Sequence, residues 1–316
     1  DPTDGGGYCR CDECLAMGPL SDRLLMHANA IAAAVREEFP DDDVGYYCAY
    51  SEHQTPPEET VAGPGVHLFM TTWVKRHFQK LSDLANRSFR DRVEAFASIS
   101  QAMAMRDFDG LTVWWGQYPI SKVEVNAADY QWYHEHGISG IVTEAHINWA
   151  PWGYHYYMMS RLWWNPYADI GELRRDFVRT AYGAAYEPML RYHKLLDAAR
   201  HNIDPHTLHA MRHDLEAAAT LACRDDVRVR VDTLRAYYLL LDIYEKQQAG
   251  VADARDLALV SRVYNSLDRH AISRRGTRIM RTLEYDSKAA PFDGEQLRAL
   301  LDRVTPHPPA ARWPAW

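Results

Sequence analysis

SGIVTEA, from Ser139 to Ala145, is an apolar run of strand length that ends close to a carboxylate. The same pattern precedes it three times, as VGYYCAYS at 44–51, GVHLFMTTW at 65–73 and LTVWWGQY at 111–118. Short runs rich in β-branched and aromatic residues, bounded by polar loops, are typical of buried strands. The sequence therefore predicts four strands.

Helical periodicity occupies the segments around and between these strands. Apolar residues recur at helical spacing over 21–38, with Ser21 as the expected N-cap, and helices are also predicted over 86–105 and 127–136. Strands that alternate with helices of this length predict βαβ crossovers and a parallel sheet.

Polar and aromatic residues follow each predicted strand. They are Ser51, Glu52 and His53; Thr71, Thr72 and Trp73; Trp114, Trp115, Gln117 and Tyr118; and Glu144, His146 and Asn148. A (β/α)8 barrel assembles its active site from such strand ends, so this fold is predicted. A doubly wound sheet would bind ligands there too, but it more often has a glycine-rich phosphate turn, and the GGG at 5–7 follows no strand.

The pattern changes after Pro166. From 170 to 304, Leu, Ala, Arg, Tyr and His recur at helical spacing, which predicts a bundle of about five helices. The predicted domains are thus a barrel region at 1–168 and an all-α domain at 169–316. Two groups of residues are expected to have structural roles. Trp163 and Trp164 are expected to be packing residues. A face of histidines is expected to be either solvated or hydrogen-bonded within the core, and it consists of His201, His206, His209 and His213.

Composition excludes some classes of partner. The 316 residues carry a net charge of −8 without a basic run, which argues against a nucleic-acid partner. No apolar run reaches the roughly 18 residues of a membrane span, and no signal-peptide pattern indicates a localisation. Tyr (19) and Trp (10) outnumber Phe (8), which suits either the faces and hydroxyl rims of sugars or an aromatic-rich core.

DPTDGGGYCRCDEC, at 1–14, is predicted to be a loop, because Asp and Gly at this density disfavour helix and strand. Its cysteines, Cys9, Cys11 and Cys14, have the spacing C-x-C-x2-C. They could bind a structural zinc ion completed by Cys48 or a histidine. A local disulfide or reduced thiols that hold a loop are the favoured interpretation, and no other cofactor is expected.

Several stretches together resemble a bacterial family of glycoside-hydrolase-like TIM barrels catalogued as a domain of unknown function. They are DPTDGGGYCRCDEC; ANRSFRDRVEAF followed by LTVWWGQYP; SGIVTEAHINW; and YYMMSRLWWNPYADIGELRRDFVRTAYGAA. The resemblance covers most of the first 190 residues. It implies a relationship to α-glucuronidase-like and endo-β-N-acetylglucosaminidase barrels, with a helical domain after the barrel.

The resemblance also implies a register within the barrel. The cysteine-containing loop is similar to the segment after the fourth strand, and the four predicted strands would be the fifth to the eighth. The expected fold is thus the second half of a (β/α)8 TIM-type barrel followed by a helical domain, with the first half outside this chain.

Glycoside cleavage requires two carboxyl groups that flank the anomeric carbon. Glu144 is the best single candidate, because it lies near the end of an apolar strand and precedes polar and aromatic residues. Asp4 and Asp1 are the candidates for its partner. The alternative for Glu144 is a carboxylate bonded to a neighbouring loop, and for the aspartates an Asx turn or loop cap.

Substrate-binding candidates surround these carboxylates. Alternation along a strand lets at most one of Trp114 and Trp115 face the barrel mouth. Arg76 suits a carboxylate such as a uronic acid, and with His77 and Asn86 it brackets a loop that could close on substrate. The candidates are Trp73, Arg76, Trp115, Tyr118, His146, Asn148 and Trp149.

The expected function is glycoside hydrolysis in a barrel-mouth cleft, on glycans that contain N-acetylhexosamine or uronic acid. A non-catalytic carbohydrate-binding barrel is the main alternative, and a structural helical adaptor is a third. A binding module would retain the aromatic residues and tolerate loss of Glu144, whereas an adaptor would place aromatic residues and carboxylates outside any common cleft.

Overall fold

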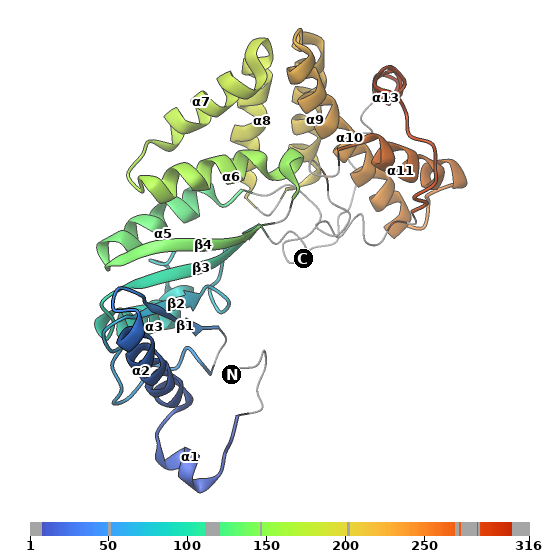
Figure 1. The fold of residues 1–316 in the computed structure, drawn as a ribbon. Helices are drawn as coiled ribbons and strands as arrows, with labels where there is room; N and C mark the ends of the chain where they lie inside the picture. The colour runs from blue at the N-terminus through green and yellow to red at the C-terminus, as the bar shows by residue number, and fades with distance from the viewer. Residues whose placement is uncertain are drawn as a thin grey trace. The chain divides into compact units, whose positions relative to one another are not determined.

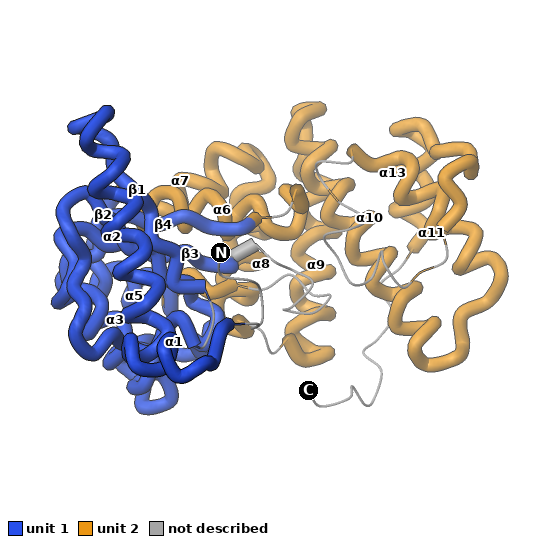
Figure 2. Tube along the Cα trace, turned by 60° about the horizontal axis from the view of Figure 1, so that its bottom comes forward, with its two compact units in different colours: residues 1–109, 125–144, 165–167 blue, residues 110–124, 145–164, 168–316 orange. Residues whose placement is uncertain are grey.

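The computed structural model describes residues 8–49, 52–110, 121–145, 147–200, 203–268, 272, 283 and 285–304. The chain divides into two compact units (Figure 2). The first contains residues 1–109, 125–144 and 165–167, and the second contains 110–124, 145–164 and 168–316. Each unit has its own core and is described separately.

The first unit is built on a four-stranded sheet in the order β1-β2-β3-β4 (Figure 1). The strands are β1 (Val44–Cys48), β2 (Val66–Thr71), β3 (Met103–Gly110) and β4 (Ile138–Ala145). β1 pairs with β2, and β2 with β3, in parallel. The mixed α/β class and the parallel sheet are thus confirmed.

Helices precede and connect the strands of this unit. They are α1 (Asp12–Ala16), α2 (Leu20–Glu38), the short 3₁₀ turn η1 (Leu84–Asn86), α3 (Arg87–Ser98) and α5 (Val123–Glu135). Because strand order follows chain order, right-handed crossovers place α3 and α5 on one face of the sheet. α2 packs against β1 and β2.

The two faces of the sheet differ in burial. The side chains at alternate positions of β1, β2 and β3 are buried: Tyr46, Cys48, Leu68, Met70, Met103 and Met105. The intervening positions, such as Tyr47 and Phe69, are only half buried, and Val142 of β4 is 51% exposed. One face therefore forms the core of the unit, and the other is partly open.

Two local predictions are wrong, and a third falls outside the described residues. The third strand of the described sheet lies at Met103–Gly110, and the strand predicted at 111–118 lies within 111–120, which is outside the described part of the chain. The helix predicted to Met105 ends at Ser98, because MAMRDFDG alternates with the period of two of a strand that is buried on one face. Ser21 is a fully buried residue inside α2, whose N-cap is Pro19.

The predicted loop at 1–14 contains a short helix at its end. Residues 1–7 are outside the described residues, but Asp12–Ala16 form α1. Asp12 and Glu13 occupy its first turn, where negative charge interacts favourably with the helix dipole.

Apart from Gly110 and Ala145, the last residues of β3 and β4, the secondary structure described in the second unit is helical. Its elements are α6 (Trp149–Trp164), α7 (Ile170–Tyr182), η2 (Gly183–Ala185), α8 (Tyr186–Ala199), α9 (Pro205–Leu221), α10 (Asp225–Gln248), α11 (Ala254–Ser266) and α13 (Gly294–Leu301). Aspartates cap four of the helices, as Asp204 does by accepting from the amides of His206 and Thr207. The helical character predicted after 170 is confirmed.

α10 is the central helix of this unit. Its side chains Val231, Leu234, Tyr237, Leu240 and Leu241 are buried, and α10 packs against α6, α9, α11 and α13. None of the helices in the described part of the chain is both long enough and apolar enough to cross a bilayer.

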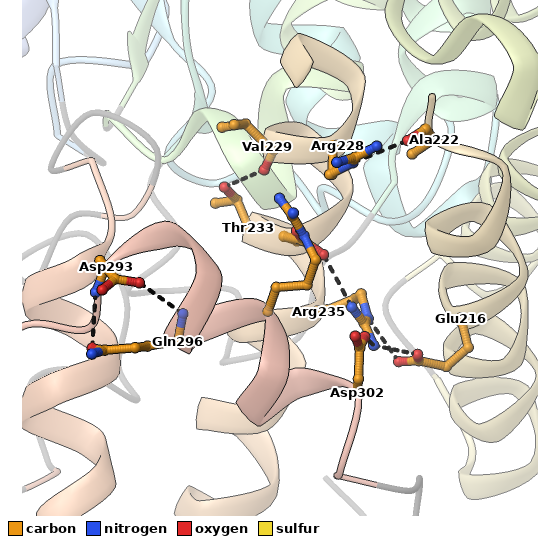
Figure 3. Close-up of polar contacts among 11 residues, drawn as sticks. Glu216, Ala222, Arg228, Val229, Thr233, Arg235, Asp293, Gln296 and Asp302 are labelled. Atoms are coloured by element: carbon orange, nitrogen blue, oxygen red, sulfur yellow. Dashed lines mark hydrogen bonds and ion pairs between the residues drawn. The ribbon is translucent and has the colours of Figure 1, made fainter. Parts of the chain in front are cut away.

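An ion-pair network fastens α10 to its neighbours (Figure 3). Arg235 donates to both carboxylate oxygens of Glu216 on α9, at 3.0 and 2.6 Å. It also donates to Asp302, the residue after α13, at 3.0 Å (Figure 3). Because the Arg235 side chain is only 3% exposed, this charge depends on its protein partners.

Two predictions about surface residues in this unit can be assessed. His206, His209 and His213 are exposed, so the solvated interpretation is confirmed for them, while His201 lies outside the described residues. Trp163 is half buried, but Trp164 is 91% exposed, so its assignment as a packing residue is wrong. Trp164 is the last residue of α6, and its side chain is almost entirely exposed to solvent.

Candidate functional site

Glu144 lies one residue before the end of β4, on the partly open face of the sheet. Its side chain is 37% exposed and accepts a hydrogen bond at Oε1 from Nη2 of Arg106 on β3. Nη1 of Arg106 in turn donates to the Tyr47 hydroxyl on β1 at 2.6 Å. The guanidinium carbon lies 5.1 Å from the centre of the Tyr47 ring, a cation–π distance.

Strand register accounts for this grouping. Tyr47 pairs with Phe69, and Thr71 pairs with Arg106, in the parallel ladders of β1, β2 and β3. A Cβ built on Gly140 would lie 3.3 Å from the Cβ of Ala104, so these two residues share a face. Since side chains alternate along a strand, Arg106 and Glu144 lie on that same face.

A hollow of about 400 Å³ opens on this face. Its lining contains a carboxylate, a guanidinium, a phenol and a phenyl ring, from Glu144, Arg106, Tyr47 and Phe69, together with Gly45, Val142 and Thr143. The volume is within the range of small-molecule sites. Chemically, the arrangement offers an anion, hydrogen-bond donors and an aromatic surface to one ligand.

Trp73 and Thr72 extend the carboxyl edge of the sheet beyond β2. Trp73 is 44% exposed and contacts Phe108 of β3 edge to face, with ring centres 5.9 Å apart. Thr72 is buried, and its hydroxyl donates to Asp107 at 2.8 Å. Trp73 is therefore partly accessible to solvent, while the residue before it anchors the strand end.

A buried ion pair that involves the segment after β2 was not predicted from the sequence. Lys75 and Asp129 form an ion pair of 2.5 Å, with both side chains 1% exposed. Burial raises the pKa of Asp129, and Lys75 opposes that shift. Asp129 also accepts from the amide of Leu81 at 2.7 Å, so the pair ties the segment after β2 to α5. Nothing in the local sequence indicates that Lys75 and Asp129, which are 54 positions apart, form a pair. The pair is best explained as a structural anchor.

The Asn86 amide side chain makes four hydrogen bonds to the backbone of the loop from Arg76 to Asn86. Asn86 is buried; its Oδ1 accepts from the Arg76 amide at 2.8 Å, and its Nδ2 donates to the carbonyls of Arg76, Gln79 and Lys80 at 3.2, 3.0 and 3.1 Å. His77 is also buried, with Nδ1 3.8 Å from Asp107. The Arg76 side chain is exposed. Asn86 thus stabilises the loop conformation that the structure describes, and closure of this loop on a substrate stays a prediction from sequence.

Two predicted binding residues belong to the second unit. Asn148 is buried, and its carbonyl accepts from the amide of Trp152. Trp149 begins α6, is 55% exposed and contacts Tyr156 with ring centres 5.1 Å apart. It lines a cleft of about 730 Å³ whose walls include Tyr157 and Phe177.

The remaining predicted residues are not in the described part of the chain. These are the candidate carboxylates Asp1 and Asp4 and the candidate binding residues Trp115, Tyr118 and His146. Their assignment stays a prediction from sequence.

The cysteines of the first loop come together. The Sγ atoms of Cys9, Cys11 and Cys14 lie within 4.8 Å of one another, which is a geometry that could hold a metal ion. A backbone hydrogen bond at Cys14, followed by the Cys9 thiol, lowers the pKa of Cys11 to about 7. Cys48 is fully buried in β1 and is not part of the group, so it does not supply the expected fourth ligand.

Comparison with known families identifies the chain at a general level. A family model described as a domain of unknown function, DUF4838, matches residues 2–194. The chain belongs to this family. Neither a curated protein nor a solved structure matches it significantly.

Proposed function

We propose that this protein is a glycoside hydrolase that cleaves its substrate at the open face and carboxyl edge of the first unit's sheet. The observation that carries the proposal is the position of Glu144. This carboxylate lies near the carboxyl end of a parallel strand, in a 400 Å³ hollow that also contains a guanidinium, a phenol and an aromatic ring.

Each of these groups has a role in sugar binding. Aromatic rings such as Tyr47 and Phe69 stack on the CH-rich face of a pyranose, and Arg106 offers donors to hydroxyl or carboxylate oxygens. Trp73 adds a third ring, which is exposed, beyond β2. The favoured substrates are glycans with uronic acid or N-acetylhexosamine units, because both present an oxygen that an arginine can bind.

Glu144 is suited to the role of an anion. Its hydrogen bond with the Arg106 guanidinium stabilises a carboxylate, as a nucleophile or water-activating base requires. The second carboxyl group of the mechanism is assigned to Asp4 or Asp1 from the sequence. With an N-acetylated sugar, the acetamido oxygen of the substrate could itself attack, and an aspartate would then position that group.

The proposed architecture for this site is part of a (β/α)8-type barrel. Two features support it: the strands follow chain order, and burial is concentrated on one face of the sheet. In such barrels the carboxyl ends of the strands form the active site. The proposal of a barrel includes the domain boundary predicted from the sequence, between residues 168 and 169.

A non-catalytic carbohydrate-binding protein is the second candidate. The observation that favours it is the pairing of Arg106 with both Glu144 and Tyr47, which holds the three side chains in one arrangement. A rigid, preformed surface of this kind binds a ligand without chemistry.

Hydrolysis assays with the full-length protein discriminate the two candidates. A panel of aryl glycosides, including uronides and N-acetylhexosaminides, should yield at least one substrate whose aglycone is released. Calorimetry with the corresponding free sugars measures binding independently. Sugar binding without release of any aglycone would refute hydrolysis and support the binding protein.

A further inference from the structure

The segment Cys9–Cys14 turns from an extended chain into a helix and thereby collects three thiols. Cys9 precedes α1, Cys11 is its N-cap with extended backbone angles, and Cys14 lies on its first turn. A C-x-C-x2-C spacing that wraps around a helix start directs all three side chains to one side. The Sγ atoms converge within 4.8 Å although the segment is only six residues long.

The sulfur separations fit a tetrahedral metal centre. With zinc–sulfur bonds of about 2.3 Å, two ligands of a tetrahedron are about 3.8 Å apart. The Cys9 and Cys11 sulfurs are 3.5 Å apart, and no pair in the group exceeds 4.8 Å. No pair of sulfurs therefore has to close by more than about 1 Å to reach the tetrahedral spacing.

A disulfide explains the group less well. All three cysteines are free thiols in the structure, and a bond between any two would leave the third thiol beside it without a role. Cys48 is buried in β1, and Cys223 belongs to the other unit. Three convergent thiols match the preference of a thiophilic ion, which binds three or four sulfurs at once.

Neighbouring charges and contacts suit an anionic metal centre. Three thiolates around a divalent ion carry one net negative charge, and Arg23 donates to the Cys9 carbonyl at 2.9 Å. Arg10 lies between two of the cysteines and pairs with Glu52 at 3.6 Å. Tyr8 hydrogen-bonds His53, so Tyr8 and Arg10 both contact the loop that follows β1.

We infer that Cys9, Cys11 and Cys14 form a binding site for a thiophilic divalent metal ion, with Zn²⁺ as the favoured occupant. Each thiol releases a proton to solvent when it becomes a metal-bound thiolate. Cys9 and Cys11 are exposed, so the fourth coordination position is open to water or another small ligand. Bound metal would fix the cysteine segment against the loop after β1. This inference does not depend on the proposed hydrolase activity.

Metal titration of the full chain tests the site. The reduced, metal-free protein is titrated with Zn²⁺, and with Co²⁺ as a spectroscopic probe of thiolate ligation. We expect about one equivalent per chain, with thiolate-to-cobalt absorption and proton release. Cys11→Ser and Cys14→Ser should abolish the equivalent, whereas the matched variant Cys223→Ser, which removes an exposed cysteine outside the cluster, should retain it.

A second measurement avoids any dependence on folded variants. Alkylation of the wild-type chain, mapped by mass spectrometry, should show Cys9, Cys11 and Cys14 protected by Zn²⁺ while Cys223 reacts equally with and without metal. Absence of saturable uptake, equal uptake by Cys11→Ser and Cys223→Ser, or a disulfide among the three cysteines that persists with Zn²⁺ under mild reduction would overturn the inference.

Discussion

His193 on α8 should make the helical unit sensitive to acid. Its ring is 3% exposed and lies between aromatic side chains, with ring centres 4.2 Å from Tyr154 and 5.0 Å from Tyr192. Burial, and to a smaller extent the positive charge of Arg174, lowers the pKa of His193 from 6.5 to about 3. The imidazole therefore stays neutral in the folded protein at pH values where it is protonated in the unfolded chain.

The sign of the effect follows from proton linkage. Below pH 6.5 the unfolded state binds a proton that the folded state does not, so the free energy of unfolding falls as the pH falls from about 6.5 to about 3. At pH 4.5, two units below the unfolded pKa, the loss attributable to His193 is about 2.7 kcal/mol relative to pH 8, at 1.36 kcal/mol per unit.

His193→Phe isolates this contribution. Phenylalanine retains an aromatic ring and cannot titrate. Urea unfolding monitored by far-UV circular dichroism, at pH 8 and pH 4.5, gives the change in unfolding free energy for each protein. The wild-type change should exceed that of the variant by about 2.7 kcal/mol. Equal changes in the two proteins would show that His193 is protonated or solvated in the folded state and would refute the reasoning.

Two further predictions concern buried polar anchors. Arg235→Ala should lower the free energy of unfolding by about 3 kcal/mol, because it removes four charge-assisted hydrogen bonds, one of them to the buried Asp232. Arg230→Ala, at an exposed pair on the same helix, should cost less than about 1 kcal/mol, and similar costs would contradict a special role for Arg235. Asn86→Ala removes the four hydrogen bonds of a buried side chain and should cost about 3 kcal/mol. Urea unfolding and limited proteolysis within 76–86 check this, and unchanged proteolysis would show that other contacts fix the loop.

The sequence identified the strands that have strong apolar runs. β1, β2 and β4 lie within a few residues of their predicted positions, because each is a short hydrophobic segment between polar loops. β3 was missed because Arg106, Asp107 and Asp109 interrupt its apolar pattern. Arg106 is stabilised in the strand by Tyr47 and Glu144, and these partners are 59 and 38 positions away.

Long-range pairing also explains what the sequence could not show about the candidate site. Glu144 was predicted as a strand-end carboxylate, and it lies near the end of β4. Its arginine partner was not anticipated, since only the strand order and register bring β3 and β4 side chains together. The hydrogen bonds of Asn86 to the loop before it were not predicted either, because a polar residue beside a helix start has no local feature that distinguishes an anchor from a ligand.

Glu144 is the residue on which the proposed function depends most directly, and Glu144→Gln is the substitution that tests it. Gln keeps the shape of the side chain and removes its charge, so the variant should retain sugar affinity within a fewfold and lose at least about a hundredfold in kcat. Glu135→Gln, which changes an exposed carboxylate at the end of α5, is the matched control and should leave kcat unchanged. The deciding measurement is kcat for both variants and the wild-type protein on a glycoside that the wild type cleaves. A kcat for Glu144→Gln equal to that of Glu135→Gln would contradict the assignment of Glu144 to catalysis.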